Sequence, residues 1–281
     1  MQKKPMIIDA HQHFWKYIPK EYQWIDNKMN ILKKDYLPDH LEPLLKETDI
    51  DGSITVQARQ SLEETEWLLQ LAKGNKIIKG VVGWVDLCSD KLGDQLGRFS
   101  SDQKLVGVRH VIHDEPDDFF ILKNDFNRGI RQLEEYNLTY DILIFEHHLP
   151  QTIEFVRKHP SQVFVVDHIA KPKIRQGNLQ PWKTNIEKLA ESENVFCKLS
   201  GMVTEADWQN WNPEMIKPYL DVVLHAFGTN RLMLGSDWPV CLVAGGYNKI
   251  IELVTNYFSA FSASEKASVF GANALKAYHL V

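Results

Sequence analysis

Apolar runs rich in β-branched residues recur along the chain at regular intervals. There are eight of them, at residues 6–8, 53–58, 77–85, 105–112, 139–145, 163–169, 195–199 and 231–234. Most are continuously apolar and do not alternate between apolar and polar positions. Such runs are typical of parallel strands that are buried on both faces. The pattern therefore predicts a parallel sheet covered by helices.

The segments between these runs have helical periodicity. After the second run, Leu62, Leu69 and Ala72 fall on one face, and Ser61 and Glu64 are spaced as a capping box. The same periodicity recurs within residues 126–133, 153–156, 182–189 and 216–227. Eight βα units in 281 residues predict an α/β fold, a single (β/α)8 TIM barrel over residues 1–281, with its active site at the C-terminal ends of the strands. A doubly wound open sheet is the alternative, but it usually has a glycine-rich turn after the first strand, where this chain has DAHQH.

One interval breaks the alternation of strands and helices. Residues 14–38, between the first two runs, carry six aromatic side chains, among them Trp15 and Trp24, together with Pro19 and Pro38. In a barrel this is a βα loop, at the end where active sites are built. We expect a long aromatic loop over the barrel mouth, whose aromatic residues either line the pocket or pack the loop onto the barrel.

Composition excludes several classes of protein. The chain has 32 Lys+Arg against 37 Asp+Glu, a net charge of −5, and 44% hydrophobic residues, with no dense basic cluster. We therefore expect no nucleic-acid partner and no membrane span. The first residues lack the apolar core of a secretory signal, and three dispersed cysteines form no CxxC pair, so we expect a cytoplasmic protein without disulfides.

Polar residues that could carry chemistry follow the first and last runs. His11 and His13 are two residues apart, so their rings project to the same side of an extended strand, toward the barrel mouth. Asp237 follows the eighth run, which lies beside the first when the barrel closes. Two histidines and one carboxylate form either an open metal site or a base flanked by two rings. A turn-capping role for Asp237 is the structural alternative.

Other strand ends supply further candidates. His168 ends the sixth run beside Asp167 and could add a third imidazole, with Lys171 as a cation near the rim. The structural alternative is a local ion pair between Asp167 and Lys171. Arg109 and His110 end the fourth run, and alternation directs one of them to the mouth. Weaker candidates at strand ends, for which a structural role is as much expected as a functional one, are Gln57, Arg59, Asp86 and Lys198. His147 and His148 follow the fifth run; because they are adjacent, they would face opposite ways in an extended segment, and we expect a surface or loop role for them.

The motifs IDAHQHFW, GVRHV, VFVVDHIAKP and FGTNRLMLGSDWPVC, in this order along the chain, resemble the amidohydrolase superfamily. More narrowly they resemble its amidohydrolase-related lactonases, the sugar lactonases akin to L-fuconolactonase. The resemblance assigns His11, His13, His168 and Asp237 to the family's metal or catalytic positions. The fourth run has no bridging lysine and the fifth run has no histidine, so two metal ions are not expected.

The resemblance implies a hydrolase that opens a sugar-acid lactone, L-fuconolactone or a related aldonolactone. Asp237 would activate the water that attacks the ester carbonyl, and His168 would assist it. Substrate contacts are expected from Trp15, Trp24, Gln57, Arg109 and His110. One divalent ion, most plausibly zinc, would be held by His11, His13, His168 and Asp237, and catalysis without metal stays open. The alternatives are a metal-dependent decarboxylase of unsaturated or aromatic acids and a non-catalytic carbohydrate-binding barrel.

Overall fold

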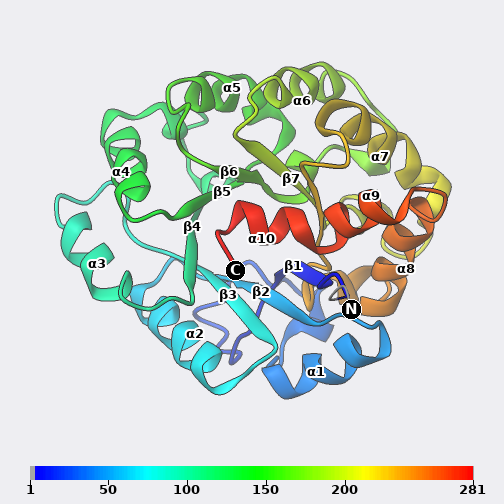
Figure 1. The fold of residues 1–281 in the computed structure, drawn as a ribbon, viewed down its shortest axis with the longest axis horizontal. Coiled ribbons are helices and arrows are strands. Elements are labelled where there is room, and N and C mark those ends of the chain that lie inside the picture. The colour runs from blue at the N-terminus through cyan, green and yellow to red at the C-terminus, as the bar shows by residue number, and fades with distance from the viewer. Residues whose placement is uncertain (1–3, 281) are drawn as a thin grey trace.

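A computed structural model describes residues 4–280 of the chain. Its eight strands form one parallel sheet in sequence order, so the predicted (β/α)8 barrel is confirmed (Figure 1). The strands are β1 Ile8–Gln12, β2 Gly52–Val56, β3 Ile78–Gly83, β4 Leu105–Val111, β5 Thr139–Leu143, β6 Phe164–Val166, β7 Val195–Leu199 and β8 Leu232–Leu234. Backbone hydrogen bonds across the seam between β1 and β8, from His13 N to Trp238 O at 2.7 Å and from Asp237 N to His11 O at 2.8 Å, bring the two edges together.

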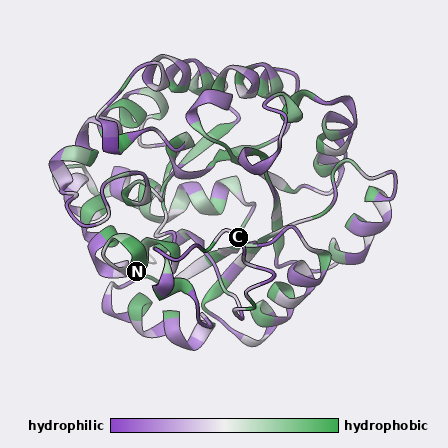
Figure 2. Ribbon diagram, turned by 180° about the vertical axis from the view of Figure 1, so that it is seen from behind, coloured by the Kyte–Doolittle hydropathy of each residue, from purple (hydrophilic) through white to green (hydrophobic). Residues whose placement is uncertain are grey.

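All of the helices except α10, which closes the bottom of the barrel, lie outside the strands, with their apolar faces turned inward and their polar faces outward (Figure 1 and Figure 2). The helices are α1 Pro38–Glu47, α2 Leu62–Gly74, α3 Leu92–Phe99, α4 Asn124–Glu135, α5 Leu149–Arg157, α6 Trp182–Ala190, α7 Pro213–Phe227, α8 Tyr247–Tyr257, α9 Ala263–Ala267 and α10 Asn273–Ala277. Half of the predicted capping box of α2 is present, because Ser61 Oγ accepts a hydrogen bond from Glu64 N. The Glu64 carboxylate accepts from Ala58 N and Arg59 N and does not complete the box at Ser61 N. Among the described residues, none of these helices is both long enough and apolar enough to cross a membrane.

The lower part of the barrel interior is an apolar layer closed by α10. Side chains from the strands, including Ile54, Val82, Phe196 and Met233, form one buried cluster with Ala277 of α10. This helix lies across the middle of the ring of strands in Figure 1, and Thr139 Oγ1 at the start of β5 donates to Ala277 O. The N-terminal end of the barrel is therefore plugged, and only the C-terminal end is open to a ligand.

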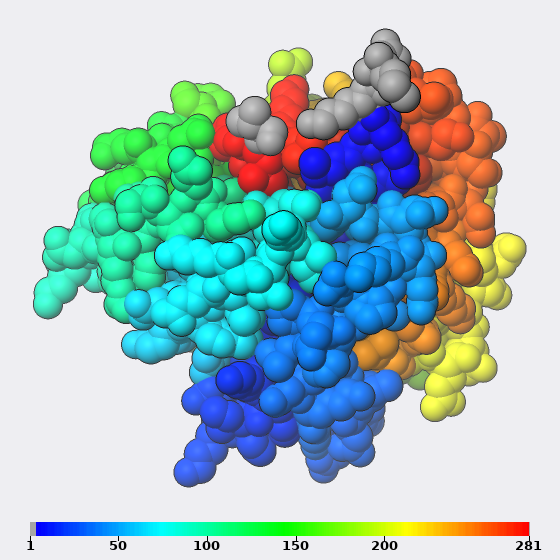
Figure 3. Space-filling view, turned by 60° about the horizontal axis from the view of Figure 1, so that its bottom comes forward, coloured from blue at the N-terminus to red at the C-terminus, as the bar shows by residue number. Residues whose placement is uncertain are grey.

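The aromatic segment before α1 lies at the opposite end of the molecule from α10, below the body in Figure 3. Trp15 and Tyr36 form an antiparallel bridge within it, and the Trp15 indole donates to Lys34 O. Trp15, Tyr22 and Tyr36 are buried, whereas Trp24 is 39% exposed. Both expectations for this loop are thus met in part: most of its aromatic residues pack the loop onto the barrel, and Trp24 lines the cavity described below.

Two strands end three or more residues away from the predicted position, and the other strand boundaries differ from the prediction by two residues at most. The first strand runs from Ile8 to Gln12, beyond the predicted residues 6–8, because the polar residues that follow Ile8 are themselves buried and paired with β2. The sixth strand ends at Val166, three residues before the predicted end. His168 therefore follows β6 in a turn and does not end the strand.

Candidate active site

Three histidines and one aspartate converge at the C-terminal end of the barrel. His11 Nε2 lies 3.2 Å from His13 Nε2, and Asp237 Oδ1 lies 3.8 Å and 3.4 Å from these two atoms. The ring of His168 is centred 4.5 Å from that of His11. All four residues are at most 5% exposed. The shared orientation of His11 and His13 and the approach of Asp237, both expected from the sequence, are confirmed.

His168 belongs to a left-handed turn. Four successive non-glycine residues, His168, Ile169, Ala170 and Lys171, have φ values of 53°, 49°, 61° and 46°. This region costs an L-residue roughly 1–2 kcal/mol, so neighbouring groups must hold the turn in place. The buried indole of Trp182 donates to Ile169 O at 2.8 Å, and His168 Nδ1 lies 2.9 Å from Ser200 Oγ.

Asp237 also lies on a left-handed backbone, with φ 57°. Its neighbour Ser236 donates through N and Oγ to the buried carboxylate of Asp9, at 2.8 Å and 2.6 Å. Ser236 Oγ in turn accepts from Trp238 N at 3.0 Å. Asp9 thus fixes the backbone on both sides of Asp237 from the neighbouring strand, and the Asp237 carboxylate is directed at the histidines.

Burial and charge set the protonation of these groups. Burial lowers the pKa of His11 and of His168 well below the usual value, so both rings are uncharged at neutral pH. Burial alone would raise the pKa of Asp237, but favourable interactions with the surrounding polar groups, the Lys171 cation among them, outweigh burial and leave that pKa below its usual value. Asp237 is therefore a carboxylate at neutral pH, as a general base must be.

Arg109 supports the cluster from β4. Its Nη1 lies 2.9 Å from Asp167 Oδ2, and its Nη2 donates to Gln57 O. The Gln57 side chain donates back to Arg109 O at 3.3 Å. Burial would raise the pKa of Asp167, but the cations of Lys198 and Arg109 hold it well below the usual range. The guanidinium of Arg109 is thereby committed largely to protein partners.

A cavity of about 170 Å³ opens above the four residues. The residues that line it are His13, Trp24, Ala58, Arg109, Val111, His113, Asp114, Leu143, His168, Lys171, Asp237 and Val240. Aromatic and apolar surface, cations and one buried carboxylate are thus brought together around one small space. Such a combination suits a compact polar ligand that presents some C–H surface.

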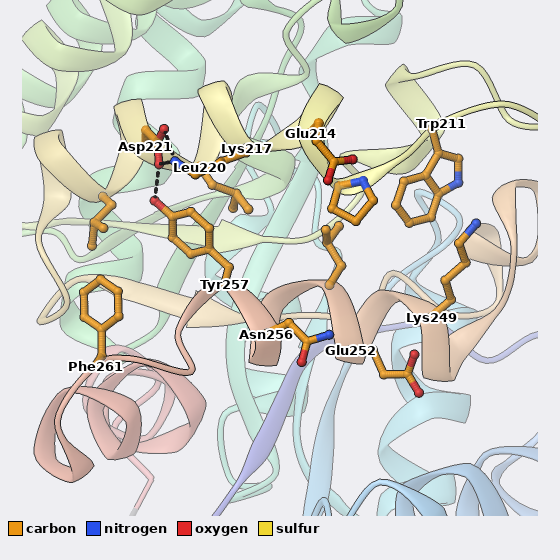
Figure 4. Close-up of a pocket in the computed structure, with 13 residues that line it drawn as sticks. Trp211, Glu214, Lys217, Leu220, Asp221, Lys249, Glu252, Asn256, Tyr257 and Phe261 are labelled. Carbon is orange, nitrogen blue, oxygen red and sulfur yellow. Dashed lines mark hydrogen bonds and ion pairs between the residues drawn. The ribbon is translucent and has the colours of Figure 1, made fainter.

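A larger hollow, of about 700 Å³, lies between α7 and α8 on the outside of the barrel (Figure 4). It is lined by Trp211, Leu220, Tyr257 and Phe261 among others, and its polar side chains pair locally, as Asp221 does with Lys217 and with the Tyr257 hydroxyl. None of the residues predicted for the site lines this hollow. The chemistry is concentrated in the smaller cavity at the barrel mouth.

The amidohydrolase family profile matches residues 8–280 of the chain. The chain belongs to the amidohydrolase family. Among curated proteins, L-fucono-1,5-lactonase of Burkholderia multivorans is 40% identical, with 97% of this chain and 96% of that protein covered, and L-fucono-1,5-lactonase of Burkholderia ambifaria is 34% identical, with 97% and 95% covered. A crystal structure of a Burkholderia multivorans amidohydrolase with bound zinc is 40% identical in sequence and has a TM-score of 0.95. The match covers 98% of this chain and 100% of that one.

The donor set of this amidohydrolase fits a metal ion. Bonds of about 2.0–2.1 Å to a tetrahedral zinc separate its ligand atoms by about 3.3 Å. The separations among His11 Nε2, His13 Nε2 and Asp237 Oδ1, 3.2 Å, 3.4 Å and 3.8 Å, are close to that value. A second group, His11, Asp167 and His168, is also compact, and shares His11 with the first. The residues suit one ion.

A third group of metal-ligand type lies near the rim and suits a metal less well. His147 and His148 approach Asp118 Oδ1 at 3.6 Å and 3.5 Å. The two rings would face opposite ways only in an extended segment, but this segment is a 3-10 turn and the ring centroids lie 3.9 Å apart. However, His148 Nδ1 accepts a hydrogen bond from Phe145 N, so Nε2 carries the proton of the neutral ring. That nitrogen then has no lone pair for a metal.

The remaining predicted residues are not all brought to the cavity. Trp24 and Arg109 line it, whereas Trp15 is buried beneath the loop and Gln57 lies behind Arg109. His110 does not line it either, because its Nε2 pairs with Glu115 at 2.7 Å and its ring stacks on Phe120. The parity of β4 therefore sends Arg109 inward and His110 outward. Of the two residues that strand alternation could direct to the barrel mouth, Arg109 is the one that points there.

Sequence reasoning missed two contributors to the site. His113 lines the cavity, and Asp167 supports the histidines. Lys171 lines the cavity as the cation expected near the rim. The alternative, a local ion pair between Asp167 and Lys171, is not observed, since Lys171 pairs with Glu205 at 3.1 Å. The left-handed turn directs the side chains of Asp167 and Lys171 to different places. No local sequence signal predicts that turn. A run of four non-glycine residues gives no hint of positive φ.

Proposed function

We propose that this chain hydrolyses the lactone of a sugar acid, with L-fucono-1,5-lactone or a related aldonolactone as substrate. The observation that carries the proposal is the similarity, over nearly the full length of the chain, to two proteins named L-fucono-1,5-lactonase. A small cavity with a buried carboxylate and neutral imidazoles supports it independently.

In the proposed reaction, the Asp237 carboxylate accepts a proton from a water molecule in the cavity. The water oxygen forms a bond to the lactone carbonyl carbon, and the carbonyl oxygen acquires negative charge. When the bond from that carbon to the ring oxygen breaks, Asp237 returns the proton to the departing oxygen. The product is an open-chain hydroxy acid, and Asp237 is a carboxylate again.

The neutral ring of His168 would donate a hydrogen bond to the developing oxyanion. His168 is held in position by Ser200 and borders the cavity with His13. Trp24 offers an aromatic face to the C–H surface of a sugar, and Lys171 provides a cation on the same wall. A zinc ion held by His11, His13 and Asp237 would, when bound, polarise the carbonyl and lower the pKa of water.

The test is Asp237→Asn, assayed by acid release from L-fucono-1,5-lactone and a panel of aldonolactones. Loss of the general base should reduce turnover by about 10²–10⁴-fold. Asp114→Asn is the matched control, because Asp114 lines the same cavity but its side chain is 66% exposed and lies outside the histidine cluster. Equal rates for Asp237→Asn and the wild type would refute the mechanism.

The same assays separate the alternative functions. A decarboxylase would release carbon dioxide from unsaturated or aromatic acids and leave lactones intact. A carbohydrate-binding barrel would bind lactones in calorimetry without turning them over. Either outcome with the wild-type protein would replace the lactonase proposal.

A further inference from the structure

A column of charged side chains is buried in the barrel beneath the cavity. Lys198 of β7 is completely buried, as are Asp141 of β5 and Asp167 after β6. At its lower end, the Tyr278 hydroxyl donates to Asp141 Oδ1 at 2.8 Å. Barrel interiors are usually filled with branched apolar side chains, and an unpaired buried charge is costly. The proposed reaction makes no use of Lys198, so this residue calls for another explanation.

The Lys198 ammonium connects this column to His11. It donates to Asp141 Oδ2 at 2.5 Å, lies 2.9 Å from Asp167 Oδ1, and lies 3.2 Å from His11 Nδ1. An ammonium group can only donate, so His11 Nδ1 is the acceptor in this contact. Asp167 Oδ1 is also 3.2 Å from His11 Nδ1, but it accepts no hydrogen bond of good geometry. The single proton of the neutral His11 ring then belongs on Nε2.

The far side of His11 agrees with this tautomer. His13 Nδ1 lies 2.7 Å from Val56 O, and because a carbonyl only accepts, the His13 proton is on Nδ1. His13 Nε2 therefore has a lone pair and accepts from His11 Nε2 at 3.2 Å. Arg109 Nη1 is 3.5 Å from His11 Nε2, the limit of a hydrogen bond, and has a nearer partner in Asp167 at 2.9 Å. One directed chain thus runs from Lys198 through both rings to Val56.

We propose that Lys198 is a positioning residue that sets the tautomer of His11 and makes its Nε2 a hydrogen-bond donor. A metal ion at His11 and His13 needs lone pairs on both Nε2 atoms, so the His11 proton must first move to Nδ1 and pair with Asp167. In that state Lys198 loses the acceptor it has at His11. Lys198 therefore weakens metal binding at a site whose distances otherwise suit it.

The first test reads the tautomer directly. Two-bond ¹⁵N–¹H NMR spectra of histidine-labelled, metal-free protein distinguish a protonated from an unprotonated ring nitrogen, and His11→Gln assigns the His11 signals. The expected result is a protonated Nε2 and an unprotonated Nδ1 for His11 in the wild type. A protonated Nδ1 would overturn the proposal, whether or not any variant folds.

The second test measures zinc affinity by chelator competition. Lys198→Met combined with Asp141→Asn removes one positive and one negative charge, so the net charge of the column is kept. We expect this double variant to bind zinc about 10–100-fold more tightly than the wild type, the range typical of groups that support metal ligands, and its His11 proton to move to Nδ1. Asp141→Asn alone is the matched control and should keep the wild-type affinity and tautomer.

Equal zinc affinity in the wild type and the folded double variant would overturn the proposal. Neither measurement uses a lactone, so its result is independent of the proposed function. If Asp237→Asn kept its activity, the proposed mechanism would fail and the proposal for Lys198 would be unaffected. If the tautomer or zinc measurement failed, the proposed function would be unaffected.

Discussion

Gly201, which follows β7, gives a sharp test of how His168 is positioned. Its φ is +61°, and a Cβ atom built on it would overlap the His168 ring, with His168 Cβ only 2.9 Å away. Gly201→Ala should therefore impose two separate costs. Alanine at this φ costs roughly 1–2 kcal/mol, and displacement of the ring would break its contact with Ser200, which contributes about 1 kcal/mol.

The expected total is a loss of about 2–3 kcal/mol in the free energy of unfolding. Activity should fall further than stability alone requires, because a catalytic group misplaced by about 1 Å can cost on the order of 10²-fold in rate. Gly177→Ala is the matched control. Its φ is +68° and nothing lies within 4 Å of a Cβ built there. It should lose only about 1–2 kcal/mol, from the backbone alone, and keep full activity.

Urea unfolding and steady-state lactone hydrolysis measure both quantities on the same preparations. The reasoning predicts that the two alanine variants differ clearly in turnover and by about 1 kcal/mol in stability. If Gly201→Ala were as active as Gly177→Ala, the close approach to His168 would have no bearing on catalysis, and the positioning of this ring by its surroundings would be refuted.

Two further variants address buried polar groups. Burial raises the pKa of Glu64 from 4.5 to about 7. The free energy of unfolding should therefore fall by up to about 3 kcal/mol as pH rises through 7 and this carboxyl ionises in the folded protein. Glu64→Gln should flatten this decline between pH 5 and pH 8 in urea unfolding, and an unchanged pH slope would contradict the assignment. Trp182→Phe removes the donor to Ile169 O and should lower both stability, by about 1–3 kcal/mol, and turnover. Trp211→Phe, which removes a comparable indole hydrogen bond to Ala244 O, should lower stability alone, and equal activity losses in both variants would refute a specific role for the turn.

The fold was predictable because its signals are local and repeated. Eight apolar runs with amphipathic segments between them correspond to eight strands and the surrounding helices. The Ser61 cap of α2 is also where the sequence places it. Boundaries were less predictable, since β1 continues through polar residues that the barrel buries.

Part of the site followed from strand geometry in the same way. The two-residue spacing of His11 and His13, together with the closure of β8 on β1, is enough to bring Asp237 to both rings. The roles of these residues in catalysis and in metal binding stay predictions. That the three side chains lie close together is observed.

The buried column could not be predicted, because its members are far apart in sequence and each is unremarkable alone. Lys198 and His11 are separated by 187 positions, and their contact depends on the barrel bringing β7 and β1 into reach of one another. From the sequence alone, a lysine in an apolar strand is as well explained by a structural role as by a functional one. Only its three partners, two carboxylates and one imidazole nitrogen, distinguish a lysine that neutralises buried charge from one that also directs a proton.

This distinction bears on how one barrel could operate with or without metal. The distances among His11, His13 and Asp237 suit a tetrahedral ion, whereas the hydrogen bonds of the same rings suit two neutral donors and acceptors in series. Both arrangements need the same side chains in nearly the same places, and they differ in the position of one proton on His11. Because Lys198 acts on that proton from outside the cavity, a substitution there changes the preference without altering any group that contacts the substrate.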